Sequence, residues 1–158
     1  MGTIWCELVM TFDIEKTVQY WMEGAAYDLE TGKSLLESKR FPYALFFGHL
    51  ALEKILKAFA VKATAEHAPF TPLEIMPRSV SSPAIAGLEF LTGFTHSLTF
   101  LASKTGIEIP ESILDRLAEY TEFHLESRYP DEKKDFYKKC SEEFAHKKLL
   151  KLKRSISG

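Results

Sequence analysis

His49, Glu53 and Lys57 are the residues whose types and spacing could most directly do chemistry. Each follows the previous one by four positions, so on a helix the three side chains form one stripe. Apolar residues such as Phe46 and Leu56 flank the stripe, and polar groups in that setting need hydrogen-bond partners from a neighbouring helix. Two interpretations stay open, a structural network that fixes helix register and a ligand or catalytic pocket.

A second polar cluster, Arg128-Tyr129-Pro130-Asp131, stands at the end of a predicted helix. An arginine there interacts favourably with the helix dipole, and the proline and aspartate can start the next turn, so capping alone accounts for the cluster. The functional alternative is an arginine that binds phosphate or stabilises a developing anion. Capping is the simpler interpretation.

Charge is distributed unevenly although the whole chain carries only -2. Residues 128–158 contain ten Lys or Arg and five Asp or Glu, and the basic run 146–154 could contact RNA phosphates or an acidic partner. The solvated face of a terminal helix is the more common meaning of such a run. Overall composition therefore does not indicate a nucleic-acid-binding protein.

Several functional classes are excluded by what the sequence lacks. Cys6 and Cys140 lie far apart without metal-ligand spacing, so we predict no disulfide scaffold and no metal site, and no phosphate-binding loop or other motif predicts a cofactor. No apolar run reaches the roughly 18 residues of a membrane span. The first twenty residues lack a basic region before an apolar one, so we expect a cytoplasmic protein.

The elements that must position these residues are helices. The 158 residues are 46% hydrophobic, which predicts one domain over 1–158. Helical spacing predicts a first helix over 14–39 with Asp13 as N-cap, and a second over 42–65 that is apolar nearly all round and belongs in the middle of a bundle.

The remaining segments complete an all-α chain. Residues 1–12 are expected to be extended or disordered, and four prolines predict a long loop over 67–84. Further helices are expected over 84–94 (weakly), 95–103, from 110 to the proline at 130, and 133–153. The expected fold is an up-and-down antiparallel bundle of four to five helices.

Four segments in order along the chain resemble the HEPN family of small helical bundles. They are Ala26-Tyr-Asp28-Leu29, His49-Leu-Ala-Leu-Glu53-Lys-Ile-Leu-Lys57-Ala, Thr95-His96-Ser-Leu98 and Glu126-Ser-Arg128-Tyr129-Pro130-Asp131. The resemblance implies a homodimer, and a ligand site drawn from the polar residues of these segments: Asp28, His49, Glu53, Lys57, His96, Arg128, Tyr129 and Asp131.

Nuclease members of that family carry an Arg-x4-6-His motif, and this sequence does not. Arg116 and His124 have seven residues between them, and Arg128 is followed by no histidine before His146. A helix turns by about 100° per residue, so the longer spacing displaces the histidine. The sequence therefore resembles the non-nuclease members, which bind a small nucleotidyltransferase partner, a nucleotide or RNA.

Three hypotheses follow for the function. The first is a non-catalytic, dimeric binding module that engages a nucleotidyltransferase, a nucleotide or RNA. The second is a divergent ribonuclease of a toxin–antitoxin type system, in which Arg128 acts with His49 or His124 as general acid or base. The third is a purely structural bundle in which the polar stripe only sets the register.

Overall fold

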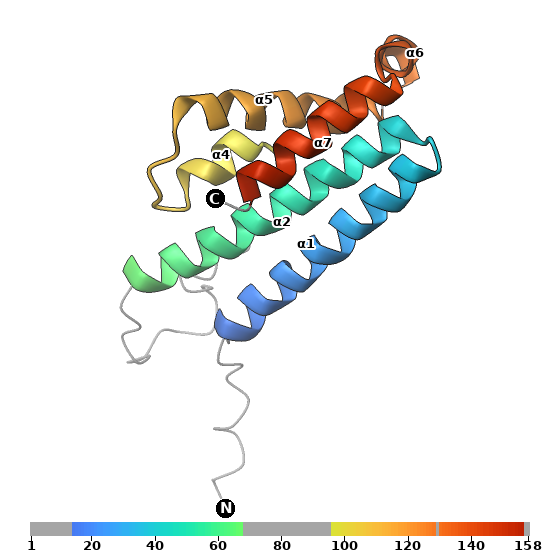
Figure 1. The fold of residues 1–158 in the computed structure, drawn as a ribbon. Coiled ribbons are helices and arrows are strands. Elements are labelled where there is room, and N and C mark those ends of the chain that lie inside the picture. The colour runs from blue at the N-terminus through green and yellow to red at the C-terminus, as the bar shows by residue number, and fades with distance from the viewer. Residues whose placement is uncertain (1–13, 68–95, 129, 157–158) are drawn as a thin grey trace, which may run out of the picture.

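The computed structural model describes residues 14–67, 96–128 and 130–156, and every element in them is a helix (Figure 1). The helical bundle predicted from the sequence is thereby confirmed. The extended segment 1–12, most of the loop 67–84 and the weak helix over 84–94 lie outside the described residues. The six helices of the described part are α1 Ile14–Glu37, α2 Phe41–His67, α4 Leu98–Ser103, α5 Glu111–Glu126, α6 Pro130–Lys139 and α7 Glu142–Ile156.

A tight turn joins α1 to α2 and makes the two helices antiparallel neighbours (Figure 1). The amide of Arg40 donates to the carbonyl of Leu35 and the amide of Lys39 to that of Leu36, which is the Schellman pattern of a helix C-terminus. Lys39 adopts φ 59°, a left-handed conformation that normally favours glycine. Pro42 then lies in the first turn of α2, where its missing amide hydrogen is not needed.

Polar and aromatic contacts hold α1 against α2. Asp28 is buried and its carboxylate lies 2.6 Å from the ammonium of Lys54. The ammonium of Lys57 lies 5.0 Å from the centroid of the Trp21 ring, a cation–π contact. Lys54 and Lys57 of α2 therefore contact α1, and Lys57 is also a member of the polar stripe.

The second helix occupies the middle of the bundle, as its apolar composition predicts. It contacts α1 on one side and α4, α5 and α7 on the other (Figure 1). Most of its described alanines and leucines are buried, and Leu45 and Ala51 are fully buried. Not every apolar residue in a helical stripe is buried, because Met22, Phe59 and Leu125 each leave more than two fifths of their surface exposed.

The single helix predicted over 133–153 is wrong, because the structure divides this segment into α6 and α7. Pro130 begins α6, which Figure 1 shows end-on beside the end of α5. The break falls at Cys140 and Ser141, where the Ser141 hydroxyl accepts a hydrogen bond from the amide of Phe144. A serine followed by two glutamates is a helix start signal, and it outweighs the helical spacing that runs across it.

The core forms where α5, α6 and α7 close over α2. Phe123 packs against Phe136 with a tilted ring and against Phe144 edge to face, with ring centroids 5.6 and 6.0 Å apart. The Tyr120 hydroxyl donates to the carbonyl of Lys148 at 2.7 Å and so ties α5 to α7. This packing fixes the position of α5 relative to α2, which the candidate site requires. None of the helices in the described segments is long and apolar enough to cross a membrane.

Candidate functional site

Glu53 is the centre of the polar cluster on α2. One carboxylate oxygen accepts from the ammonium of Lys57 at 2.7 Å. The other lies 3.3 Å from Nε2 of His49 and 3.0 Å from Nδ1 of His96. The predicted stripe of His49, Glu53 and Lys57 therefore exists, and all three side chains are buried. Its partner from outside α2 is His96, which the sequence could not place.

The electrostatics of the cluster keep Glu53 ionised. Burial by itself raises the pKa of this carboxyl group, but hydrogen bonds from His49, Lys57 and His96, together with the Lys57 charge, outweigh burial and lower the pKa to about 2. Glu53 is thus an acceptor with no hydrogen of its own at neutral pH. Each group that contacts it must donate.

His49 connects this cluster to α5. Its side chain is fully buried, and its Nδ1 lies 2.9 Å from the backbone carbonyl oxygen of Tyr120. A carbonyl and an ionised carboxylate are both acceptors, so the two contacts of His49 are satisfied together only when both ring nitrogens carry hydrogens. His49 therefore has a structural place between α2 and α5, and neither of its nitrogens is open to a ligand.

His96 lies at the open side of the cluster, immediately before α4. The hydroxyl of Ser97 caps α4 by accepting from the amide of Phe100, and the amide of Leu98 donates to the hydroxyl of Thr121 on α5. These bonds fix the backbone next to His96 while half of its side chain stays exposed. Nδ1 of His96 donates to Glu53, and no hydrogen bond reaches its Nε2 from the described residues.

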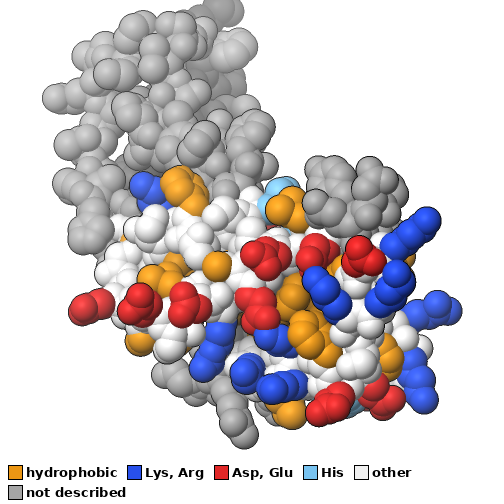
Figure 2. All heavy atoms as spheres, turned by 90° about the horizontal axis from the view of Figure 1, so that it is seen from above, with side chains coloured by type: hydrophobic (Ala, Val, Ile, Leu, Met, Phe, Trp, Pro, Cys, Tyr) orange, Lys and Arg blue, Asp and Glu red, His pale blue; other side chains and the backbone are white. Residues whose placement is uncertain are grey.

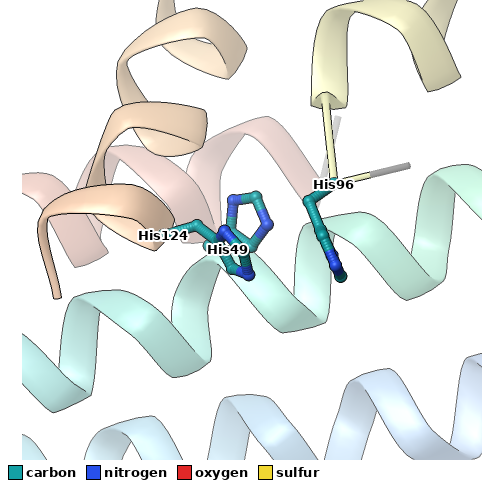
Figure 3. Close-up of side chains that lie close together, drawn as sticks. All are labelled: His49, His96 and His124. Carbon is teal, nitrogen blue, oxygen red and sulfur yellow. The ribbon is translucent and has the colours of Figure 1, made fainter. Parts of the chain in front are cut away.

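His124 is buried behind His96. Their rings stack with centroids 4.3 Å apart, and Phe46 stacks on His124 with centroids 5.6 Å apart. Figure 3 shows the three histidines gathered over α2, coming from α2 (His49), α5 (His124) and the segment entering α4 (His96). Burial first, and then the positive charges of His49, His96 and Arg128, lower the pKa of His124 to about 4. It is a neutral ring at pH 7.

Arg128 reaches the cluster from just beyond the C-terminal end of α5. Its guanidinium nitrogen lies 3.2 Å from Nε2 of His124, and a guanidinium can only donate, so Nε2 accepts. The hydrogen of the neutral ring is then on Nδ1, which is buried without a partner in the described part of the chain. Arg128 itself is exposed and makes no ion pair with any described carboxylate. Its positive charge therefore faces solvent at the edge of the cluster.

The three histidines also present a set of nitrogens that a metal ion could use, since these atoms lie within 4.8 Å of one another. The rings of His96 and His124 are nearly parallel, at 23°, so their lone pairs run side by side and do not converge on one point. Arg128 already occupies Nε2 of His124. The arrangement is suited to hydrogen bonding, and one ring would have to turn before an ion could be coordinated.

Of the residues expected at a site, six come together in this cluster: His49, Glu53, Lys57, His96, His124 and Arg128. Asp28 does not join them, because it pairs with Lys54 between α1 and α2. Tyr129 lies outside the described residues, as does the side chain of Asp131. The carbonyl of Tyr120 was not expected, and no side-chain pattern could have indicated it.

The basic C-terminal run is partly neutralised. Lys148 pairs with Glu119 of α5, and its ammonium lies 5.2 Å from the Phe144 ring centroid. Seen from above, acidic side chains lie among basic ones on this face of the molecule (Figure 2). Lys147 and Lys151 are exposed, and Leu152 is buried, so the described part of the run has one solvated and one buried face.

The family model of the HEPN domain matches residues 18–71. The resemblance to the HEPN family is confirmed. The HEPN match covers most of α1 and all of α2, so His49, Glu53 and Lys57 lie inside it, whereas His96, His124 and Arg128 lie outside. No curated protein and no solved structure matches the chain.

Proposed function

We propose that this HEPN protein is a binding module for RNA, and that a backbone phosphate lies against Arg128 and the exposed edge of His96. HEPN domains commonly interact with nucleotides or RNA, and the charge of the cluster supports an anionic ligand. Its single carboxylate, Glu53, already accepts from Lys57, His49 and His96. The Arg128 charge therefore has no counterion among the described groups, and this observation carries the proposal.

The geometry of Arg128 supports phosphate binding in particular. One guanidinium nitrogen donates to His124, which holds the planar group in place, and the side chain is exposed. An arginine fixed in this way can bind a phosphate through two hydrogen bonds at once. RNA is favoured over a free nucleotide because an extended chain bound at the exposed Arg128 can add contacts to the exposed lysines of α7.

The test is equilibrium binding of a fluorescent single-stranded RNA of about 20 nucleotides, with ATP as the competing small ligand. We expect Arg128→Ala to weaken RNA binding about tenfold or more, the effect of a lost charge-assisted hydrogen bond. Arg116→Ala is the matched control, because Arg116 lies on α5 about 18 Å before Arg128 along the helix axis. Equal affinity of both variants and the unmodified protein would contradict the proposal.

The dimer and the nucleotidyltransferase partner implied by the family resemblance belong to this proposal as well. A light-scattering mass with and without RNA tests the dimer. Co-purification of the native protein with a small nucleotidyltransferase tests the protein partner. A monomer that binds neither RNA nor another protein would leave only the structural role of the polar stripe.

RNA cleavage is the second candidate, favoured by the 3.2 Å contact between Arg128 and His124. The two residues lie four positions apart, His124 in α5 and Arg128 just beyond its end, in the reverse order of the Arg-x4-6-His motif. The geometry argues against His124 and His49 as acid–base groups, because both are buried and their nitrogens are occupied or enclosed. A cleaving HEPN protein of this structure needs another histidine.

A further inference from the structure

One carboxylate oxygen of Glu53 lies where two histidines from different elements meet. It is 3.3 Å from Nε2 of His49 in α2 and 3.0 Å from Nδ1 of His96 at the entry to α4. Ligand atoms that bind a tetrahedral ion at roughly 2.0 to 2.2 Å are about 3.4 Å apart from one another, so these three atoms need to spread by only a few tenths of an ångström. Two imidazole nitrogens and a carboxylate oxygen are also a ligand set that Zn²⁺ takes in proteins.

We propose that His49, Glu53 and His96 form a binding site for one transition-metal ion of the Zn²⁺ class. The ion takes the place of the hydrogens that join the two histidines to the carboxylate in the metal-free protein. His49 releases its Nε2 proton to solvent and His96 moves its proton from Nδ1 to Nε2, so both bonding nitrogens carry a lone pair. The site goes against the expectation from the sequence, because His96 follows Glu53 by 43 positions and no ligand spacing marks it.

His49 is held in the way that metal-binding histidines usually are. Such histidines commonly donate their second ring hydrogen to a backbone carbonyl or a carboxylate, which fixes the tautomer and the direction of the ring. Nδ1 of His49 has this contact with the carbonyl oxygen of Tyr120 at 2.9 Å, so Nε2 is the nitrogen that faces the ion. In the metal-free protein this buried ring needs two hydrogens to satisfy both of its contacts, and an ion at Nε2 removes that need.

His96 provides access for the ion. Half of its side chain is exposed, whereas Glu53 and His49 are buried, so an ion can enter from the His96 side. Figure 3 shows the rings of His49 and His96 over α2. With three ligands from the protein, a tetrahedral ion keeps its fourth position for water or for an oxygen of another molecule.

The charges around the site select the kind of ion. The second oxygen of Glu53 accepts from the ammonium of Lys57 at 2.7 Å, which orients the carboxylate but opposes a cation. Arg128 adds a second positive charge through its contact with His124. Mg²⁺ and Ca²⁺ depend on several oxygen ligands, and a single carboxylate beside two cations binds them poorly. Zn²⁺, Co²⁺ and Ni²⁺ are bound well by imidazole nitrogens and are the ions expected here.

His124 is not a ligand in this site, although nitrogens of the three histidines lie within 4.8 Å of one another. Its ring is nearly parallel to that of His96, at 23°, and its Nε2 accepts from Arg128. A site of three histidines would need one ring to turn, whereas the set with Glu53 uses contacts that already exist. His124→Phe separates the two arrangements, because it keeps an aromatic ring and removes both nitrogens.

The experiment titrates the untagged full chain, after EDTA treatment and dialysis, with ZnCl₂ by calorimetry and with CoCl₂ by visible absorption. We expect one ion per chain, the intense visible bands of tetrahedral Co²⁺ and no binding of MgCl₂. His96→Ala should lower the Zn²⁺ affinity at least about a hundredfold, the upper end of the loss for an outer-shell change. Glu53→Gln should also lower it, whereas His124→Phe and the control His146→Ala, exposed on α7, should bind Zn²⁺ normally.

Four results overturn the inference, each with circular dichroism showing that the variant is folded. They are no binding of Zn²⁺ or Co²⁺ by the unmodified protein, and an unchanged affinity in His96→Ala. Loss of binding in His124→Phe would assign the ion to the three histidines, and loss in His146→Ala would assign it to the surface of α7. RNA binding is measured separately in EDTA, so this inference and the proposed function can each fail without the other.

Discussion

Replacing Glu53 with glutamine removes the charge at the centre of the polar cluster while keeping the shape of the side chain. In the unmodified protein the pKa of this group is lowered from 4.5 to about 2. Each pKa unit corresponds to about 1.4 kcal/mol, so the ionised carboxylate stabilises the fold by about 3 kcal/mol at neutral pH. The same range is typical when one member of a buried charged pair is removed and its partner is left behind.

The assay is urea unfolding at several pH values, monitored by circular dichroism. At pH 7 we expect Glu53→Gln to lower the free energy of unfolding by about 3 kcal/mol, and the exposed Glu30→Gln on α1 to change it little. Because a lowered carboxyl pKa stabilises the folded state only above the unfolded pKa, the difference should shrink as the pH falls from about 4.5 towards 2.

This pH dependence separates the electrostatic explanation from a general packing defect. A packing defect would persist unchanged at low pH. A loss below about 0.5 kcal/mol at pH 7, or a loss that does not depend on pH, would refute the view that Glu53 is held ionised by His49, Lys57 and His96.

Three further predictions concern stability, each measured by urea unfolding. Lys39→Gly should raise the free energy of unfolding by about 0.5 to 1 kcal/mol, because glycine adopts the left-handed conformation at the end of α1 without steric strain. As the control, Lys33→Gly inside α1 should lower the free energy of unfolding by about 1 kcal/mol. If both variants lose stability equally, the strain at the turn is absent. The pKa of His124 is lowered from 6.5 to about 4 in the folded protein, so the unfolded chain binds this proton first as the pH falls. The free energy of unfolding should therefore fall by up to about 1.4 kcal/mol per pH unit between pH 6.5 and 4. His124→Phe should make this pH dependence weaker, and an unchanged dependence would assign it to other groups. Tyr120→Phe should cost about 1 kcal/mol through the lost bond to the carbonyl of Lys148, and no cost would mean that water replaces this bond.

The sequence was sufficient for the features that depend on helical spacing alone. The stripe of His49, Glu53 and Lys57 follows from positions four apart on one helix, and the central place of α2 follows from its apolar surface. The contact between His124 and Arg128 also depends only on such spacing. A search for arginine followed by histidine missed it, although side chains four apart on a helix meet in either order.

Other features depended on tertiary contacts that no spacing encodes. His96 lies 43 positions after Glu53, and its place is set by the bonds that Ser97 and Thr121 make around it. The partner of His49 is a backbone carbonyl, a group that every residue carries. The exposed state of His96 and the enclosed state of His124 likewise follow from packing, so the histidine with the open nitrogen could not be chosen from the sequence.

The bond from His49 to the carbonyl of Tyr120 joins α2 to α5. A shift of α5 along α2 by a single helical turn, about 5.4 Å, would exceed the length of any hydrogen bond and break this contact. The ring nitrogen signals of His49 in a nuclear magnetic resonance spectrum therefore report whether the two helices are in register. They offer a local probe of native packing that can be followed in each variant without any ligand.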